Sequence, residues 1–78
     1  MSKARRFSVV LIAEDNGTYQ VIVPALPEVN AMGVTRDEAY ANAAEAIELV
    51  LEQRLADGVD VPEGDTVEIG QVRVAAAR

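Results

Sequence analysis

Residues 24–47 read PALPEVNAMGVTRDEAYANAAEAI, and this stretch contains both the end of a predicted strand and the start of a predicted helix. Its two prolines cannot donate a ladder hydrogen bond, so a strand that precedes them must end there. Thr35 and Glu38 have the spacing of a capping box, in which Thr35 accepts from the Glu38 amide and Glu38 reaches back to the Thr35 amide. The alanine-rich run beyond them has high helix propensity up to Gly58. A helix is therefore predicted after Thr35, with Gly58 just past its end.

Two runs of β-branched residues precede this stretch. Residues 7–13 (FSVVLIA) and residues 18–23 (TYQVIV) predict strands. Asn16 and Gly17 lie between them, and both residue types tolerate positive φ, which is a strong hairpin signal. Residues 29–32 are expected to return along this hairpin as a short third strand.

A further strand is predicted over residues 66–74 (TVEIGQVRV). Its alternation changes phase at Gly70, where a bulge would restore the register. The predicted order is ββ(β)αβ. This is an α+β fold in one domain over residues 1–78, with a three- or four-stranded, mostly antiparallel sheet and one helix on one face.

The predicted helix covers one face of this sheet and leaves the other face uncovered. With about 100° between successive residues, one helix stripe is expected to face the sheet: Tyr40, Ala43, Ala44, Ile47, Leu51 and Leu55. In the first strand the residues predicted to meet that stripe are Phe7, Val9, Leu11 and Ala13.

The opposite face carries Val10 and Ile12, joined by Ile22 of the second strand. Burying each of these side chains is worth roughly 1.5–3 kcal/mol, and a single helix covers only one face. We therefore expect a homo-oligomer, a dimer or a tetramer, that uses this face or an edge strand.

The sequence offers little catalytic equipment. It contains neither histidine nor cysteine, so the usual general base, thiol nucleophile and metal ligands are missing. The acidic residues of two loops are better explained as a hairpin turn and a solvated connection than as cation sites: Glu14 and Asp15 beside Asn16, then Asp57, Asp60, Glu63 and Asp65. Within the predicted strands Glu68 is the only carboxylate. We expect no cofactor, no metal and no enzymatic activity.

The formal net charge of −6 argues against direct binding of nucleic acid, which requires a basic face. Lys3, Arg5 and Arg6 form the only cationic cluster, interpreted as a solvated edge, with a short basic arm as the alternative. The longest apolar run near the N-terminus, residues 9–13, is too short for a signal segment or a membrane span. We therefore expect a cytoplasmic protein without a membrane partner.

The outward arc of the predicted helix is mainly acidic. It contains Glu38, Asn42, Glu45, Glu48, Leu49, Glu52 and Gln53. Acidic groups around one leucine would suit a basic partner with a small apolar pocket, so Glu45, Glu48, Leu49 and Glu52 are the candidate partner-binding residues. The alternative is an ordinary solvated helix face with one exposed leucine.

The central stretch resembles the HicB family of antitoxins. That pattern has Pro-x-Leu-Pro after a hairpin, then a glycine, then Thr-x-x-Glu-Ala opening a helix with Asn-Ala-x-Glu-Ala. The matching residues are Pro24, Leu26, Pro27, Gly33, Thr35, Glu38, Ala39, Asn42, Ala43, Glu45, Ala46 and Ile47. The family often has Asp, Gly and Cys at the positions of Ala25, Glu28 and Val29, which implies a different loop and puts partner specificity in question.

The resemblance implies a partial RNase H-like fold without the catalytic residues. It also implies a role in binding and blocking HicA, a small, basic, mRNA-cleaving toxin. Many members carry a C-terminal DNA-binding segment that has no match here, so operator binding is not carried over. Two alternatives stay open: a stand-alone HicB-like scaffold domain with another partner, and an RNase H-like hydrolase that uses metal and carboxylates.

Overall fold

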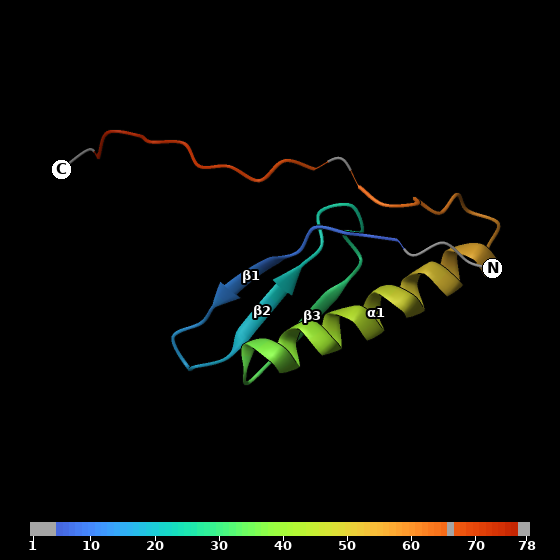
Figure 1. Ribbon diagram of the computed structural model, residues 1–78, viewed down its shortest axis with the longest axis horizontal. Coiled ribbons are helices and arrows are strands. Elements are labelled where there is room, and N and C mark those ends of the chain that lie inside the picture. Colours follow the sequence, from blue (N-terminus) through green and yellow to red (C-terminus); the bar gives the residue numbers. More distant parts are fainter. Residues whose placement is uncertain (1–4, 66, 77–78) are drawn as a thin grey trace.

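The computed structural model describes residues 5–65 and 67–76. Its elements are β1 (Val10–Ala13), β2 (Tyr19–Ile22), β3 (Asn30–Gly33) and α1 (Arg36–Ala56). The strands form one antiparallel sheet in the order β1-β2-β3, and α1 lies across one face of it (Figure 1). The α+β arrangement predicted from the sequence is confirmed, although the first two strands are shorter than predicted.

The β1–β2 hairpin turns through a three-residue loop. The Gly17 amide donates to the Glu14 carbonyl over 3.1 Å, and the Glu14 amide donates to the Thr18 carbonyl over 2.8 Å. Gly17 has a φ of +87°, whereas Asn16 keeps a negative φ. This is a type I turn followed by a left-handed glycine. The hairpin is confirmed, but only Gly17 uses the positive φ that the Asn-Gly pair allows.

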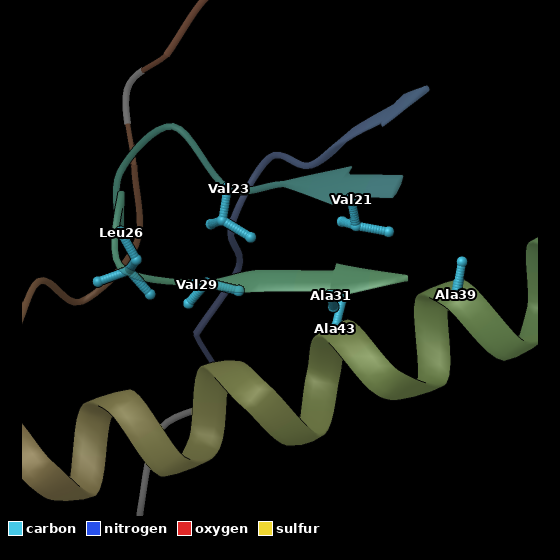
Figure 2. Packing of buried hydrophobic residues seen from close by; sticks show 7 residues of the cluster. All are labelled: Val21, Val23, Leu26, Val29, Ala31, Ala39 and Ala43. Atoms are coloured by element: carbon cyan, nitrogen blue, oxygen red, sulfur yellow. The ribbon is translucent and has the colours of Figure 1, made fainter. Parts of the chain in front are cut away.

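The core lies between the sheet and α1 (Figure 2). Val21 pairs with Leu11 on one side and with Ala31 on the other, so these three residues share the face toward the helix. The buried set is completed by two alanines of α1 and by three residues that follow β2: Ala39 and Ala43, then Val23, Leu26 and Val29. Phe7 and Val9 pack against this cluster, as predicted. Ala13 is exposed instead, because α1 packs on β3 and β2 and leaves the end of β1 uncovered.

Gly33 brings β3 into close contact with α1. A Cβ at this position would lie 2.5 Å from the Ala39 nitrogen and 2.9 Å from its Cα, inside van der Waals contact. The Asn42 side chain of α1 also donates to the Met32 carbonyl over 2.8 Å. Together these contacts fix which side of the helix meets the sheet.

Both helix ends are capped. The Thr35 hydroxyl accepts from the Glu38 amide over 3.1 Å, as predicted, but the Glu38 carboxylate accepts from the Val34 amide rather than that of Thr35. At the other end Gly58 has a φ of +71° and donates to the Leu55 carbonyl, while the Val59 amide donates to that of Arg54. These two hydrogen bonds define a Schellman motif and confirm Gly58 as the residue past the helix end.

The buried side of α1 differs from the predicted stripe. Ala39, Ala43, Ala46, Ile47, Val50 and Leu51 face the core. Tyr40, Ala44 and Leu55 are exposed, so their assignment to the core is wrong. Apolar residues occupy more than one side of this helix, so periodicity alone does not select the buried side. The close approach at Gly33 selects the side that carries Ala39 and Ala43.

The predicted last strand is also wrong for a single chain. Residues 67–76 form no strand and are exposed, with Val72 at 86% and Val74 at 78% exposure; Thr66 lies outside the described residues. Among the described residues after α1, the one β-type pairing is an isolated parallel bridge between Gly64 and Arg6. Gly70 therefore lies outside any strand, and the predicted bulge is not formed. No helix within the two described ranges is long and apolar enough to span a membrane.

Candidate partner-binding surface

The candidate residues Glu45, Glu48, Leu49 and Glu52 lie together on α1, on the side away from the sheet. Their spacing of three and four residues makes them neighbours on one helix face. All four are exposed, and Leu49 reaches 61% exposure. We call these four residues the acidic ridge. The structure therefore brings the predicted partner-binding residues together on one accessible surface.

A groove of about 590 Å³ runs along one flank of the acidic ridge. Phe7, Ile47 and Leu51 are half-buried in its apolar lining, and Leu55 is exposed at its end. Glu48 and Glu52 line it from the ridge, whereas Arg5 lines it from the N-terminal segment; Ala44 completes the wall. Glu45 and Leu49 lie outside the groove. The surface thus combines an apolar cleft with two carboxylates beside it.

The groove exists because α1 is much longer than the sheet. Strands of four residues span about 13 Å, whereas a helix of 21 residues spans about 32 Å. The C-terminal half of α1 therefore extends past the sheet, as Figure 1 shows. The N-terminal segment lines one flank of this half and the Glu28–Arg54 pair ties the loop after β2 to it, but the apolar side of residues 47–55 is incompletely covered.

The sequence pattern does not predict the N-terminal wall of the groove. Arg5 belongs to the cluster predicted as a solvated edge, Phe7 is a predicted core residue and Leu55 is predicted on the sheet-facing stripe, yet all three line the groove. The signal available was the length of the predicted helix relative to the predicted strands. Lys3, the third residue of the cationic cluster, lies outside the described residues.

An ion pair joins the loop after β2 to the last turn of α1. The Glu28 carboxylate accepts two hydrogen bonds from Arg54, with 2.7 Å from Nε to Oε2 and 2.8 Å from Nη2 to Oε1. The hydrogen bond from Arg54 is the main reason that the pKa of Glu28 lies below its ordinary value, and the same bond raises the pKa of Arg54.

Ala25, Glu28 and Val29 are the positions where the chain departs from the HicB pattern. Glu28 keeps a negative φ, so the loop here does not require a glycine. Val29 is buried in the core and Ala25 is half-buried. Of these three departures, Glu28 is the exposed one, and it holds the loop against α1 rather than leaving it free.

In each of the two acidic loops, one side chain accepts hydrogen bonds from a nearby residue. The Asn16 side chain accepts from the Thr18 amide over 3.1 Å and from the Thr18 hydroxyl over 2.7 Å. The Asp65 carboxylate accepts from the amide and hydroxyl of Ser8. Glu68 is exposed. In the described parts of the chain no three acidic, histidine or cysteine residues gather where they could hold a metal ion. What the described surface offers a ligand is apolar burial and charge pairing.

The opposite face of the sheet carries a second apolar surface. Val10 pairs with Ile22 and Ile12 pairs with Gln20, on the face turned away from the Leu11–Val21–Ala31 row. Ile22 is 40% exposed, and Met32, paired with Gln20, is exposed beside it. The predicted placement of Val10, Ile12 and Ile22 away from the helix is therefore found, while their role in self-association stays a prediction.

Comparisons with known proteins agree on one family. A family model described as HicB_like antitoxin of bacterial toxin-antitoxin system matches residues 6–76. A UPF0150 protein of Thermoplasma acidophilum is 33% identical over 82% of this chain and 93% of its own length. A UPF0150 protein of Synechocystis is 42% identical over 70% of this chain and 75% of its own length.

The fold is shared with a solved antitoxin domain. The crystal structure of the N-terminal domain of Burkholderia pseudomallei antitoxin HicB superposes with a TM-score of 0.67 at 36% identity, over 72% of this chain and 66% of that one. The family match covers nearly the whole sequence, and the resemblance noted in residues 24–47 lies inside it. This chain belongs to the HicB-like family of antitoxins of bacterial toxin–antitoxin systems.

Proposed function

We propose that this protein binds and neutralises a small, basic, mRNA-cleaving toxin of the HicA type by direct protein–protein contact. The observation that carries this proposal is the acidic ridge beside the groove on α1. A basic toxin would meet Glu48 and Glu52 with its charges and would place an apolar side chain against Ile47 and Leu51. A toxin that cleaves mRNA acts in the cytoplasm, so the proposal places its antitoxin there too.

Charge complementarity supports this reading. The chain carries a formal net charge of −6, and acidic surfaces accelerate and select the approach of basic partners. The exposed apolar residues Leu49 and Leu55 supply the desolvated contacts that charges alone do not provide. Binding should therefore weaken as salt rises, because the charges lie at the surface, but part of it should persist.

The experiment is a rescue assay paired with a binding measurement. A HicA-type toxin from the same genome is expressed in bacteria, and growth is followed with this protein or a variant supplied in trans. Wild type should restore growth. Glu48→Lys and Leu49→Arg should abolish the rescue and weaken the affinity measured by calorimetry by roughly one to two orders of magnitude, the range of an interface hot spot.

The matched control is Glu14→Lys. It makes the same charge change at an exposed position in the hairpin turn, outside both the acidic ridge and the groove. It should rescue growth as well as wild type does. Equal affinity for Glu48→Lys, Leu49→Arg and wild type would reject the acidic ridge as the contact. Failure of wild type to bind the toxin would reject the antitoxin role and favour a stand-alone scaffold domain with another partner.

The proposal includes no enzymatic activity of the protein itself. The competing idea is an RNase H-like hydrolase, which requires several carboxylates around divalent metal ions. A nuclease assay with Mg²⁺ or Mn²⁺ tests it, with Glu68→Gln as the informative variant. Metal-dependent cleavage by wild type that Glu68→Gln removes would overturn the non-catalytic reading.

Self-association is the last part of the proposal. Val10, Ile12 and Ile22 present apolar surface on the face of the sheet that α1 does not cover. We expect a second copy of the chain to cover this face, which gives a dimer or a tetramer. Light scattering on the full chain should give a mass of two or four copies, and Ile22→Lys should reduce it; a single-copy mass would reject this part.

A further inference from the structure

The outer edge of β1 presents unpaired backbone groups. Since the Glu14 amide bonds the Thr18 carbonyl, the bonded pairs along this antiparallel ladder are Ile12–Gln20 and Val10–Ile22. The amides and carbonyls of Leu11 and Ala13 therefore point away from β2. In the described ranges no hydrogen bond joins them to another residue, so this edge is open to another strand.

The described segment after α1 comes close to the residues that precede β1 but forms no ladder with β1. The parallel bridge between Arg6 and Gly64 brings the segment after α1 beside the start of β1. One residue later the Asp65 carboxylate accepts from the Ser8 amide, and also from the Ser8 hydroxyl over 3.2 Å. The acceptor for the Ser8 amide is thus a side chain and not a backbone carbonyl, and residues 67–76 then leave as an exposed trace separate from the sheet (Figure 1).

This departing segment has the composition of a strand. Val67, Ile69, Val72 and Val74 are β-branched, and each is exposed. Gly70 marks the phase change and has open space around it. An extended, alternating, apolar segment without a partner is what a free sheet edge accepts. One copy thus carries both a free edge and a free strand-forming segment.

The β3 edge is the poorer acceptor. The outward carbonyl of Met32 already accepts from the Asn42 side chain, and α1 packs closely against β3 at Gly33. A strand added there would lose a backbone hydrogen bond or displace Asn42. The edge of β1 has no such obstacle among the described residues, and it lies next to the bridge from which the segment departs.

We propose that residues 67–74 of one copy add as a strand to the outer edge of β1 of a second copy, and that two copies exchange these segments reciprocally. Reciprocal exchange pairs both free edges and closes the assembly at two chains. The added strand also widens the apolar face that contains Val10 and Ile12. This inference does not depend on the toxin, because both of its partners are copies of the same chain.

The first experiment measures the mass of the full chain by light scattering over a range of concentrations. Wild type should show two copies. Val72→Lys and Val74→Lys should weaken dimerisation by roughly tenfold or more, because a charge then replaces a buried apolar side chain. Gln71→Lys is the matched control, since it adds the same charge on the other side of the extended segment, and it should remain dimeric.

The second experiment locates the added strand by amide hydrogen exchange. The Leu11 and Ala13 amides should be protected in the wild-type dimer and exchange rapidly in Val72→Lys. The Asn30 amide, at the β3 edge, should exchange rapidly in both proteins.

Three results would overturn the proposal. One is a monomeric wild type. Another is protection of Leu11 in a monomer, which would mean that the segment pairs within its own chain. The third is a dimer that Ile22→Lys breaks and Val72→Lys does not, which would assign the contact to the sheet face alone.

Discussion

The Glu28 carboxylate and the Arg54 guanidinium form a bidentate ion pair that ties the loop after β2 to the last turn of α1. Two parallel charge-assisted hydrogen bonds fix both the distance and the orientation of the two groups. The pair lies where the helix passes beyond the sheet, on the half of α1 that also lines the groove. It therefore helps to hold the candidate partner-binding surface in place.

Replacing Glu28 by Gln should make stability less sensitive to acid. The folded chain holds the pKa of Glu28 below its ordinary value of 4.5, so the charged form is favoured by folding. Its contribution is present above 4.5 and is lost as the pH falls through the lowered pKa. Thermal melts followed by circular dichroism should separate the two proteins near neutral pH and converge in acid. The separation should be small, because the pair is partly exposed.

The control for this experiment is Glu52→Gln. Glu52 is an exposed glutamate of the same helix without an ion pair in the described ranges. Its melting curve should follow that of wild type across the pH series. A Glu28→Gln protein that parallels wild type at every pH would contradict a stabilising role for the pair.

Gly33→Ala should destabilise the fold strongly. The new methyl group would lie 2.5 Å from the Ala39 nitrogen, and a helix backbone cannot yield as a flexible side chain does. Overpacking of this kind costs about 1–3 kcal/mol, and chemical denaturation would measure it. Gly70→Ala provides the comparison, since nothing lies within 4 Å of a Cβ there. Equal midpoints for the two variants would argue against the close packing of β3 on α1.

Two leucine-to-alanine changes should differ sharply. Leu26 is fully buried in the loop between β2 and β3, so Leu26→Ala leaves a cavity and should cost about 2–5 kcal/mol of unfolding free energy. Leu49 is 61% exposed, and Leu49→Ala should leave the unfolding free energy nearly unchanged. Urea denaturation measures both. A small loss for Leu26→Ala would show that this loop does not form part of the core.

Thr35→Ala should remove the N-cap of α1. The hydroxyl accepts from the Glu38 amide, and loss of such a cap costs about 1 kcal/mol. Thr35→Ser keeps the hydroxyl and should stay close to wild type in the same denaturation assay. If Thr35→Ser lost as much stability as Thr35→Ala, the methyl group rather than the cap would be responsible.

Local interactions made part of this structure predictable. The hairpin at Gly17, the cap at Thr35 and the Schellman end at Gly58 each depend on residues a few positions apart. The order of the three strands and the helix followed from the same signals. The acidic ridge was also predictable, because helical spacing alone brings Glu45, Glu48, Leu49 and Glu52 onto one face.

Contacts between distant residues decided the rest. Only the tertiary structure shows that Gly33 presents Ala39 to the sheet, that Glu28 reaches Arg54, and that Arg5 and Phe7 wall the groove. In the structure residues 67–74 also lie apart from the sheet, although their alternating apolar residues predict a strand within it.

The physical reason is one of range. The sequence determined the hairpin turn and both ends of α1, since turns and caps are settled by neighbours along the chain. The buried helix face, the groove and the fate of the last segment depend on what a distant surface leaves uncovered. Where apolar residues occupy several sides of α1, or a segment such as residues 67–74 could pair with more than one edge, packing makes the choice.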